Sequence, residues 1–226
     1  WPRDERRLQR VVLEADPDGG VLAARYGVGV DPGAITFAAS LRRGGGPVLD
    51  VGEHSRVIDE RVQLLPGPEG SDRAAAVWRD AAYTTAEAIS GNAPFDWFVD
   101  CGRFRPGTPS LEFARLASLT VVLVGPSTED LLQLPSTLQM LASEKCLVAV
   151  VVVGRPAHDL DEVKEFLGTD HVFAAPGSRN LPAETAAVIN TSRARRGWLW
   201  RGAVNLASQL EMVVPRPVPL MEVGAP

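Results

Sequence analysis

Short, uninterrupted runs of apolar residues, rich in valine, are the feature of this chain that most constrains its fold. Bounded by turn residues, such runs predict strands that are buried on both faces of a sheet. The five clearest are Arg10–Ala15, Asp96–Cys101, Thr120–Gly125, Leu147–Gly154 and His171–Pro176. Because strands of this kind need helices on either side of their sheet, the runs predict an α/β protein.

The segments between these runs carry helix signals, namely Ser caps, Ala-rich periodic stretches and Gly stops. Two weaker strands, Val48–Gly52 and Arg61–Gly67, form a hairpin-like patch. The resulting alternation favours a doubly wound, mostly parallel sheet with helices on both faces. The predicted helices cover residues 20–27, 32–43, 71–91, 110–118, 127–143 with a kink at Pro135, 159–168, 181–190 and 197–212.

Length and composition favour one globular domain. The chain has 226 residues, of which 45% are hydrophobic and 23% charged, and this excludes a wholly disordered chain. Its net charge of −5 excludes a protein built to coat DNA or anionic lipid. No repeat is evident, so we expect a single domain over residues 1–212 and a Pro-rich C-terminal tail over residues 213–226.

Cysteine usage and hydropathy predict a cytoplasmic location. Cys101 and Cys146 are too few for a disulfide framework or a four-cysteine zinc site, and both adjoin apolar runs, so we expect buried thiols in a reducing compartment. The longest apolar run, Cys146–Gly154, is far shorter than the ~20 residues that span a bilayer. The opening WPRDERRLQR has no apolar core typical of a signal peptide.

Acidic residues follow two of the predicted strands. Glu14, Asp16 and Asp18 lie at or just past the end of the first, and Asp100 ends the strand that begins near Asp96. In an open parallel sheet, ligands bind beyond the carboxyl ends of the strands, and carboxylates there suit a magnesium-nucleotide site. The alternative is that these aspartates only cap turns, because Asp-Pro-Asp-Gly is also a strong turn signal.

Other polar patterns carry weaker signals. Gly27–Gly33 imitates a dinucleotide fingerprint but follows a helix, and the three histidines are too scattered to be metal ligands. The basic and aromatic segment Ser192–Arg201 precedes an amphipathic helix, which predicts either a membrane or nucleic-acid contact or simply a last helix packed on the sheet.

The two predicted strand ends carry the motifs VVLEADPDGG, from Val11, and FDWFVDCG, from Phe95. With other segments, these motifs resemble the ParA/MinD-like ATPases, in particular the divergent MinD-like group common in actinobacteria. VVLEADPDGG resembles the family segment with a D-x-D-P-Q-G-type motif, although Glu14 replaces its usual first Asp, and FDWFVDCG resembles the Walker B strand. The strand–helix segment from Thr120, the strand from Leu147, the segment from Phe173 and the closing helix also match, so that the resemblance extends over residues 10–210.

The resemblance implies a set of site residues. Asp16 matches the switch carboxylate that positions the attacking water or a water in the second coordination shell of magnesium, and Asp100 matches the Walker B carboxylate that holds magnesium. Glu14 is expected beside the metal, on a magnesium-bound water. Three residues are implied at the nucleotide: Gly102, which senses the γ-phosphate; Arg155, where the family often has an Asn against adenine; and Pro176, which begins a segment like the family's P-x-D…A.

The family's phosphate-binding loop has no counterpart in this sequence, since no G-x-x-x-x-G-K-[ST] motif occurs. The opening residues resemble the loop that follows the P-loop helix, and the first residue is Trp1 rather than Met. We therefore expect the first strand and P-loop helix of the domain to lie outside these 226 residues.

The resemblance implies a switch ATPase for intracellular positioning or partitioning, as in chromosome partitioning and cell division. ATP and Mg²⁺ would join two identical protomers, and hydrolysis would release them from a protein partner or from a membrane or nucleoid surface, with Ser192–Arg201 and the following helix as the contact. The fragment alone is expected to be inactive. The alternative is a catalytically inactive MinD-like scaffold that no longer binds nucleotide.

Overall fold

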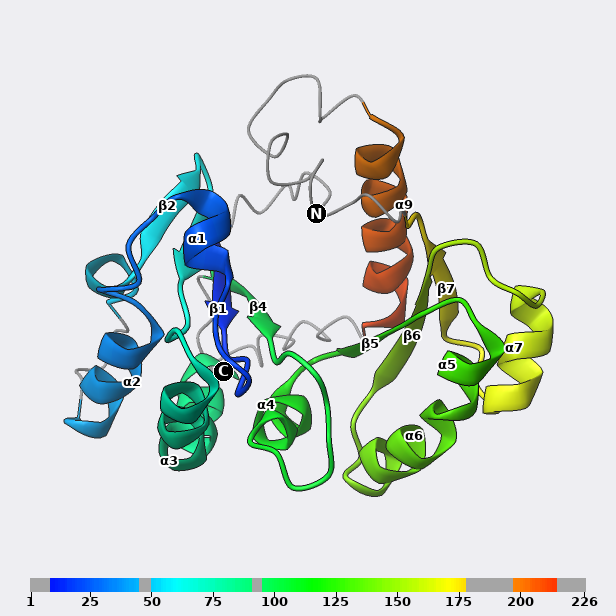
Figure 1. Ribbon diagram of the computed structural model, residues 1–226, viewed down its shortest axis with the longest axis horizontal. Helices are drawn as coiled ribbons and strands as arrows, with labels where there is room; N and C mark the ends of the chain where they lie inside the picture. Colours follow the sequence, from blue (N-terminus) through cyan, green and yellow to red (C-terminus); the bar gives the residue numbers. More distant parts are fainter. Residues whose placement is uncertain (1–8, 45–49, 91–94, 178–196, 215–226) are drawn as a thin grey trace, which may run out of the picture.

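The computed structural model describes residues 9–44, 50–90, 95–177 and 197–214, and its strands form two sheets (Figure 1). The first sheet has the order β2-β3-β1-β4, in which β1 lies parallel to both β3 and β4. The second has the order β5-β6-β7, with all neighbours parallel. Their bounds are β1 Gln9–Glu14, β2 Arg56–Asp59, β3 Val62–Leu65, β4 Phe95–Asp100, β5 Thr120–Val124, β6 Val148–Val153 and β7 Val172–Ala175.

Helices follow most of the strands. Their bounds are α1 Leu22–Tyr26, α2 Ala34–Arg42, α3 Ser71–Ser90, α4 Ser110–Leu116, α5 Thr128–Leu132, α6 Leu134–Ser143, α7 Leu160–Leu167 and α9 Trp198–Val213, with a short 3₁₀ helix at Gly52–His54. Gly27 ends α1 in the left-handed conformation, as the sequence predicts. In place of the predicted single helix over 127–143 with a kink at Pro135, two helices, α5 and α6, meet at Gln133, and Pro135 lies in the first turn of α6, where proline is tolerated.

The first sheet buries one face beneath α2, α3 and α4. Val11 and Leu13 of β1 pack there against Phe37 of α2 and Trp78 of α3. Trp78 is fully buried and meets the ring of Phe113 from α4 edge-on, at a centroid distance of 5.6 Å. This aromatic contact fixes α3 and α4 relative to each other, and both helices flank the loops at the carboxyl ends of β1 and β4.

The second sheet is covered on both faces, as its valine run predicts. Val150 and Val152 of β6 pack with α5, α6 and α7, while Ala149 and Val151 face Leu210 of α9. All four side chains are completely buried. Helices therefore lie on both sides of this sheet, and the predicted α/β class with a mostly parallel sheet is confirmed.

Two sequence predictions for the weaker strands need correction. Residues 52–54, within the predicted strand Val48–Gly52 and just beyond it, form the 3₁₀ helix, and residues 45–49 lie outside the described part of the chain. The hairpin partner of β3 is instead β2, whose antiparallel pairing the sequence analysis missed. β2 is a short strand at the edge of the sheet with Val57 largely exposed, so it has no apolar run by which to be recognised. The predicted helix 181–190 lies outside the described residues.

Candidate functional site

Asp16 and Asp100 lie at adjoining strand ends. β1 and β4 pair with Glu14 opposite Asp100, and the Ala15 N–H donates to the Asp100 carbonyl oxygen over 2.7 Å. Asp16 is the next residue after Ala15. Burial raises the pKa of the Asp16 carboxyl above its usual value, and the nearby negative charge of Asp100 raises it further, against a lowering by the Asp18 N–H. The two carboxylates thus occupy one edge of the sheet, where the sequence analysis expected them.

Gly102 contacts the Asp16 carboxyl group closely. A Cβ atom built on residue 102 would stand 2.1 Å from both Cγ and Oδ1 of Asp16. Residue 102 has a φ of +61°, a left-handed conformation that glycine adopts without strain. Its N–H donates to Asp100 Oδ1 over 3.0 Å. Gly102 therefore touches both acidic side chains, and no larger residue fits there without displacing Asp16.

Within the described chain, each of the two carboxylates has one oxygen that accepts no hydrogen bond. Asp16 Oδ1 accepts the Asp18 N–H over 2.8 Å, and Asp100 Oδ1 accepts that of Gly102. No described residue donates to the second oxygen of either side chain. A pair of carboxylate oxygens fits the hard, oxygen-seeking Mg²⁺, which commonly takes one or two protein carboxylates and completes its shell with water and phosphate. The described residues contain no cluster of three or more His, Cys, Asp or Glu that could hold a metal by themselves.

Glu14 is engaged elsewhere and does not suit its predicted role beside magnesium. Its side chain is 1% exposed, and Oε1 accepts the N–H groups of Val21 and Leu22 over 2.6 and 2.8 Å. Oε2 accepts the Gly67 N–H over 2.8 Å. With both oxygens occupied by backbone donors, Glu14 ties the start of α1 and the loop after β3 to the end of β1. This geometry favours a structural role.

Arg155 and Pro176, predicted at the nucleotide, follow strands of the second sheet. Arg155 is exposed just past the end of β6, and Pro176 follows β7 and packs against Gly202 of α9. Within the described residues, neither forms a hydrogen bond or ion pair with Asp16 or Asp100. Both residues therefore lie at the carboxyl ends of their strands, as Asp16 and Asp100 do, but they form no polar contact with these two carboxylates.

Cys101 is partly buried against the core of the first sheet, and Cys146 is also only partly buried, whereas the sequence predicted two buried thiols. Burial raises the pKa of Cys101 to about 12, with further contributions from the charges of Asp100 and Asp16. A thiol with so high a pKa is not a nucleophile at neutral pH.

An ion pair that the sequence analysis missed joins the two loops of the site. Arg105 lies in the loop after β4, and Asp18 lies in the loop after β1. Arg105 Nη1 is 3.3 Å from Asp18 Oδ1, and Nη2 is 3.3 Å from Oδ2. Eighty-seven positions separate these residues, so no local pattern could reveal the pairing. Asp18 itself was noted as an acidic residue at the strand end, whereas Arg105 had no recognisable signal.

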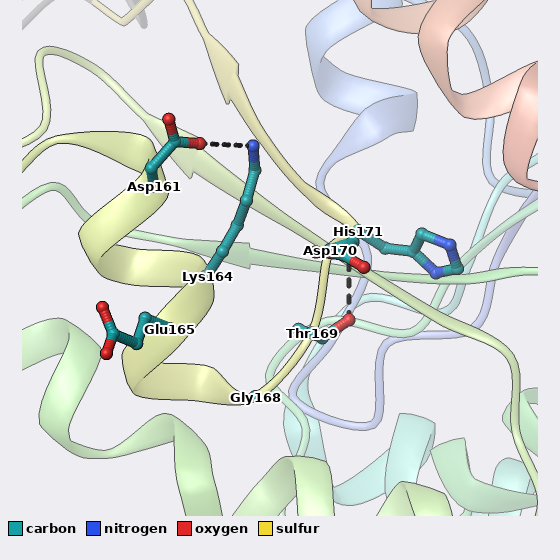
Figure 2. A pocket seen from close by; sticks show the side chains of 7 residues that line it. All are labelled: Asp161, Lys164, Glu165, Gly168, Thr169, Asp170 and His171. Carbon is teal, nitrogen blue, oxygen red and sulfur yellow. Dashed lines mark hydrogen bonds and ion pairs between the residues drawn. The ribbon is translucent and has the colours of Figure 1, made fainter.

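A hollow of about 700 Å³ lies at the amino end of β7, away from Asp16 and Asp100 (Figure 2). Its charged side chains come mostly from α7, where Lys164 donates to Asp161 over 2.7 Å, and His171 points to one side of it. Its walls also include Glu165, Gly168, Thr169 and Asp170. Because ligands of parallel sheets bind at the carboxyl ends of strands, this open hollow is not our candidate site.

Comparison with solved structures assigns the fold. A ParA family ATPase from Chlorobium tepidum superposes with a TM-score of 0.72 at 13% identity, over 92% of this chain and 88% of that one. MinD from Pyrococcus horikoshii, solved with Mg-ADP, gives 0.69 at 13% identity, over 92% and 85%.

The fold is that of the ParA/MinD ATPases. A third structure with this fold, the D38A variant of McdA from Cyanothece in complex with ATP, gives a TM-score of 0.66 at 14% identity, over 93% of this chain and 87% of that one. No family model and no curated protein matches the sequence. The ParA/MinD-like fold expected from the sequence is therefore confirmed by structure rather than by sequence similarity. In the described residues, no helix is long and apolar enough to cross a membrane.

Proposed function

We propose that this chain belongs to a magnesium-dependent switch ATPase that positions or partitions cellular cargo, and that Asp16 and Asp100 are its metal-facing carboxylates. The observation that carries the proposal is that both acidic side chains contact Gly102, at the carboxyl ends of neighbouring parallel strands. Two structures with the same fold contain Mg-ADP or ATP, which supports a nucleotide as the ligand.

The roles follow from the surroundings of each side chain. Asp100, held by the Gly102 N–H, would hold Mg²⁺ through its second oxygen, and Asp16 would bind the ion through a water molecule. When bound, the ion neutralises charge on the phosphates. Asp16 would also orient the attacking water, because its raised pKa makes its free oxygen a better proton acceptor than an ordinary aspartate.

Gly102 would connect nucleotide state to this pair. Its N–H holds Asp100 and its Cα lies against the Asp16 carboxyl group, so a shift of the loop after β4 reaches both carboxylates at once. We propose that this connection is how a γ-phosphate would be sensed. The roles predicted for Arg155 and Pro176 at the nucleotide remain part of the proposal and rest on their strand-end positions.

The two sheets leave a place for a further strand. Within the described chain, β4 and β5 are edge strands. The Asp100 carbonyl faces β1 and the Thr120 N–H faces β6. Since backbone groups alternate sides along a strand, those of Trp97 and Val99 in β4 and of Val121 and Leu123 in β5 point away from their paired neighbours. Leu123 is 67% exposed.

We infer that one more parallel strand joins β4 to β5, supplied by polypeptide outside these 226 residues, and that it leads into the phosphate-binding loop and helix. Such a strand would end beside Asp16 and Asp100, where the positive and N–H donor groups that phosphates require are needed. The chain itself has two lysines, Lys145 before β6 and Lys164 in α7, and neither lies in the loops after β1 and β4.

ATP would bridge two copies of the protein, and hydrolysis would release them from a protein partner, a membrane or the nucleoid. The surface contact would involve Ser192–Arg201 and α9, of which residues 192–196 lie outside the described chain. Trp198 and Trp200 are 52% and 44% exposed, which suits a contact surface. We place this activity in the cytoplasm.

A catalytically inactive scaffold is the second candidate. The engagement of Glu14 by three backbone N–H groups favours it, because one of the two acidic residues predicted at the metal is withdrawn from the site. A scaffold would keep the sheets and lose metal dependence.

ATP turnover separates the two functions. We expect the 226-residue chain to show no turnover with magnesium, and the full-length protein to hydrolyse ATP at a rate that Asp16→Asn lowers while nucleotide binding persists. Turnover unaffected by Asp16→Asn, or loss of ATP binding in that variant with an intact fold, would contradict the role given to Asp16. A full-length protein that neither binds nor hydrolyses ATP would be the scaffold.

A further inference from the structure

A second pocket lies beside the acidic pair, on the α3 side of the two loops. Its volume is about 280 Å³. The loop after β1, the exposed side of α3 and the loop after β4 enclose it, and the proposed metal site uses none of its charged residues. Its walls are formed by Pro17, Asp18, Ala75, Arg79, Arg105, Gly107, Thr108 and Pro109.

The charges of this pocket are unbalanced. Arg105 forms an ion pair with Asp18, and both side chains are about half exposed, at 50% and 49%. Arg79 is exposed and forms no hydrogen bond or ion pair with any described residue. Two guanidinium groups and a single carboxylate thus line one pocket, and the guanidinium group of Arg79 has no partner among the described residues.

We propose that this pocket binds an oxyanion, either a carboxylate or a phosphate group, between Arg79 and Arg105. Guanidinium groups bind carboxylates and phosphates through paired N–H donors, and Arg79 gives up no contact with a described residue when it does so. The anion competes with Asp18 for Arg105. Since an exposed ion pair is only weakly stabilising, Asp18 can be displaced by a ligand that engages two arginines at once.

Displacement of Asp18 would be transmitted to the acidic pair. The Asp18 N–H donates to Asp16 Oδ1, and Arg105 is three residues from Gly102, which touches Asp16. An anion that frees Asp18 therefore loosens the link between the loop that carries Asp16 and the loop that carries Gly102. This consequence for Asp16 rests on the proposed function, whereas the binding of the anion does not.

The test is a titration of the 226-residue chain by amide NMR without nucleotide or magnesium, at constant ionic strength. Inorganic phosphate is added in one arm and N-acetylglutamate in the other, and the amides of Asp18, Gly107 and Thr108 are followed. We expect saturable shifts with at least one of the two anions, and the arm that saturates identifies the source as phosphate or carboxylate.

Three variants decide the assignment. Arg79→Gln, which keeps most of the side-chain length, should weaken binding by about tenfold, as for loss of one charge partner. Arg73→Gln, on the same helix but outside the pocket, should leave it unchanged. Asp18→Asn should tighten binding, because it removes the competing carboxylate.

The proposal would be overturned if neither anion gave saturable shifts. It would also be overturned if the wild type and Arg79→Gln bound the anion with equal affinity. Weaker binding by Asp18→Asn would overturn the competition with Asp18. A failure of ATP binding in the full-length protein would leave these results intact, so the two proposals fail separately.

Discussion

The carboxyl group of Asp16 occupies the space that a side chain at Gly102 would need, since a Cβ atom on residue 102 would stand 2.1 Å from Asp16 Cγ. This contact joins the loop after β1 to the loop after β4, in addition to the pairing of the two strands themselves. The candidate site therefore depends on the absence of a side chain as much as on the presence of two carboxylates.

Gly102→Ala should displace Asp16 and destabilise the fold. The new methyl group collides with the Asp16 carboxyl, and the left-handed backbone adds its own strain, so we expect a loss of about 2–3 kcal/mol in the free energy of unfolding. Gly107→Ala is the matched control, because residue 107 has a φ of +76° and nothing lies within 4 Å of its would-be Cβ. Denaturant unfolding measures both, and equal losses would show that the contact with Asp16 has no energetic effect.

Asp16→Asn should stabilise the protein at neutral pH. Because the pKa of Asp16 is raised in the folded state, ionisation of this group costs stability, and that cost is absent at low pH and fully present above the folded-state pKa. Asparagine keeps an oxygen for the Asp18 N–H and carries no charge. The advantage of the variant over wild type in urea unfolding should shrink as the pH falls to about 3. A variant that is less stable at neutral pH would refute this electrostatic account.

Glu14→Gln should destabilise the protein whether or not magnesium is present. An amide nitrogen placed where a carboxylate oxygen accepts backbone N–H groups leaves a buried donor facing another donor, at a cost of about 2–3 kcal/mol. Glu69→Gln, at an exposed position, is the control and should change little. If Glu14→Gln instead kept full stability and lost magnesium affinity, the predicted metal role of Glu14 would be restored.

Hydrogen exchange should reveal the open edges of β4 and β5. In the 226-residue chain, the amides of Val121 and Leu123 face away from β6 and should exchange faster than those of Val122 and Val124, which point toward it. In a full-length protein that supplies the additional strand, Val121 and Leu123 should become as protected as their neighbours. Fast exchange of both amides in the full-length protein would argue against a strand between the sheets.

Much of the fold follows from local sequence, because β1, β4, β5, β6 and β7 all carry continuous apolar runs, and the order of strands and helices then predicts the parallel sheets. Burial on both faces, which these runs also predicted, holds for β6 but not for β4 and β5: β4 has no fully buried residue, and Leu123 of β5 is 67% exposed. β2 escaped because an exposed edge strand needs no such apolar run: Val57 is 73% exposed. A short edge strand is defined by its pairing with a neighbouring strand, and a local sequence pattern does not show that pairing.

The sequence could predict which residues lie at the strand ends of the site. It could not predict which groups their side chains contact. The strand-end rule placed Asp16 and Asp100 together, since parallel neighbours end at one edge. It also grouped Glu14 with them, although the alternation of side chains and the approach of Val21, Leu22 and Gly67 turn this carboxylate into the interior. Long-range partners of this kind are set by tertiary packing.

The most direct test of the central claim, that Asp16 and Asp100 form the metal-facing side of a nucleotide site, is calorimetric titration of full-length protein with ATP in the presence and absence of magnesium. We predict magnesium-dependent binding that Asp100→Asn weakens by at least about tenfold, as expected for loss of a charged metal ligand. Asp170→Asn, in the hollow at the amino end of β7, should bind like the wild type. Binding that is independent of magnesium, or unchanged by Asp100→Asn, would contradict the claim.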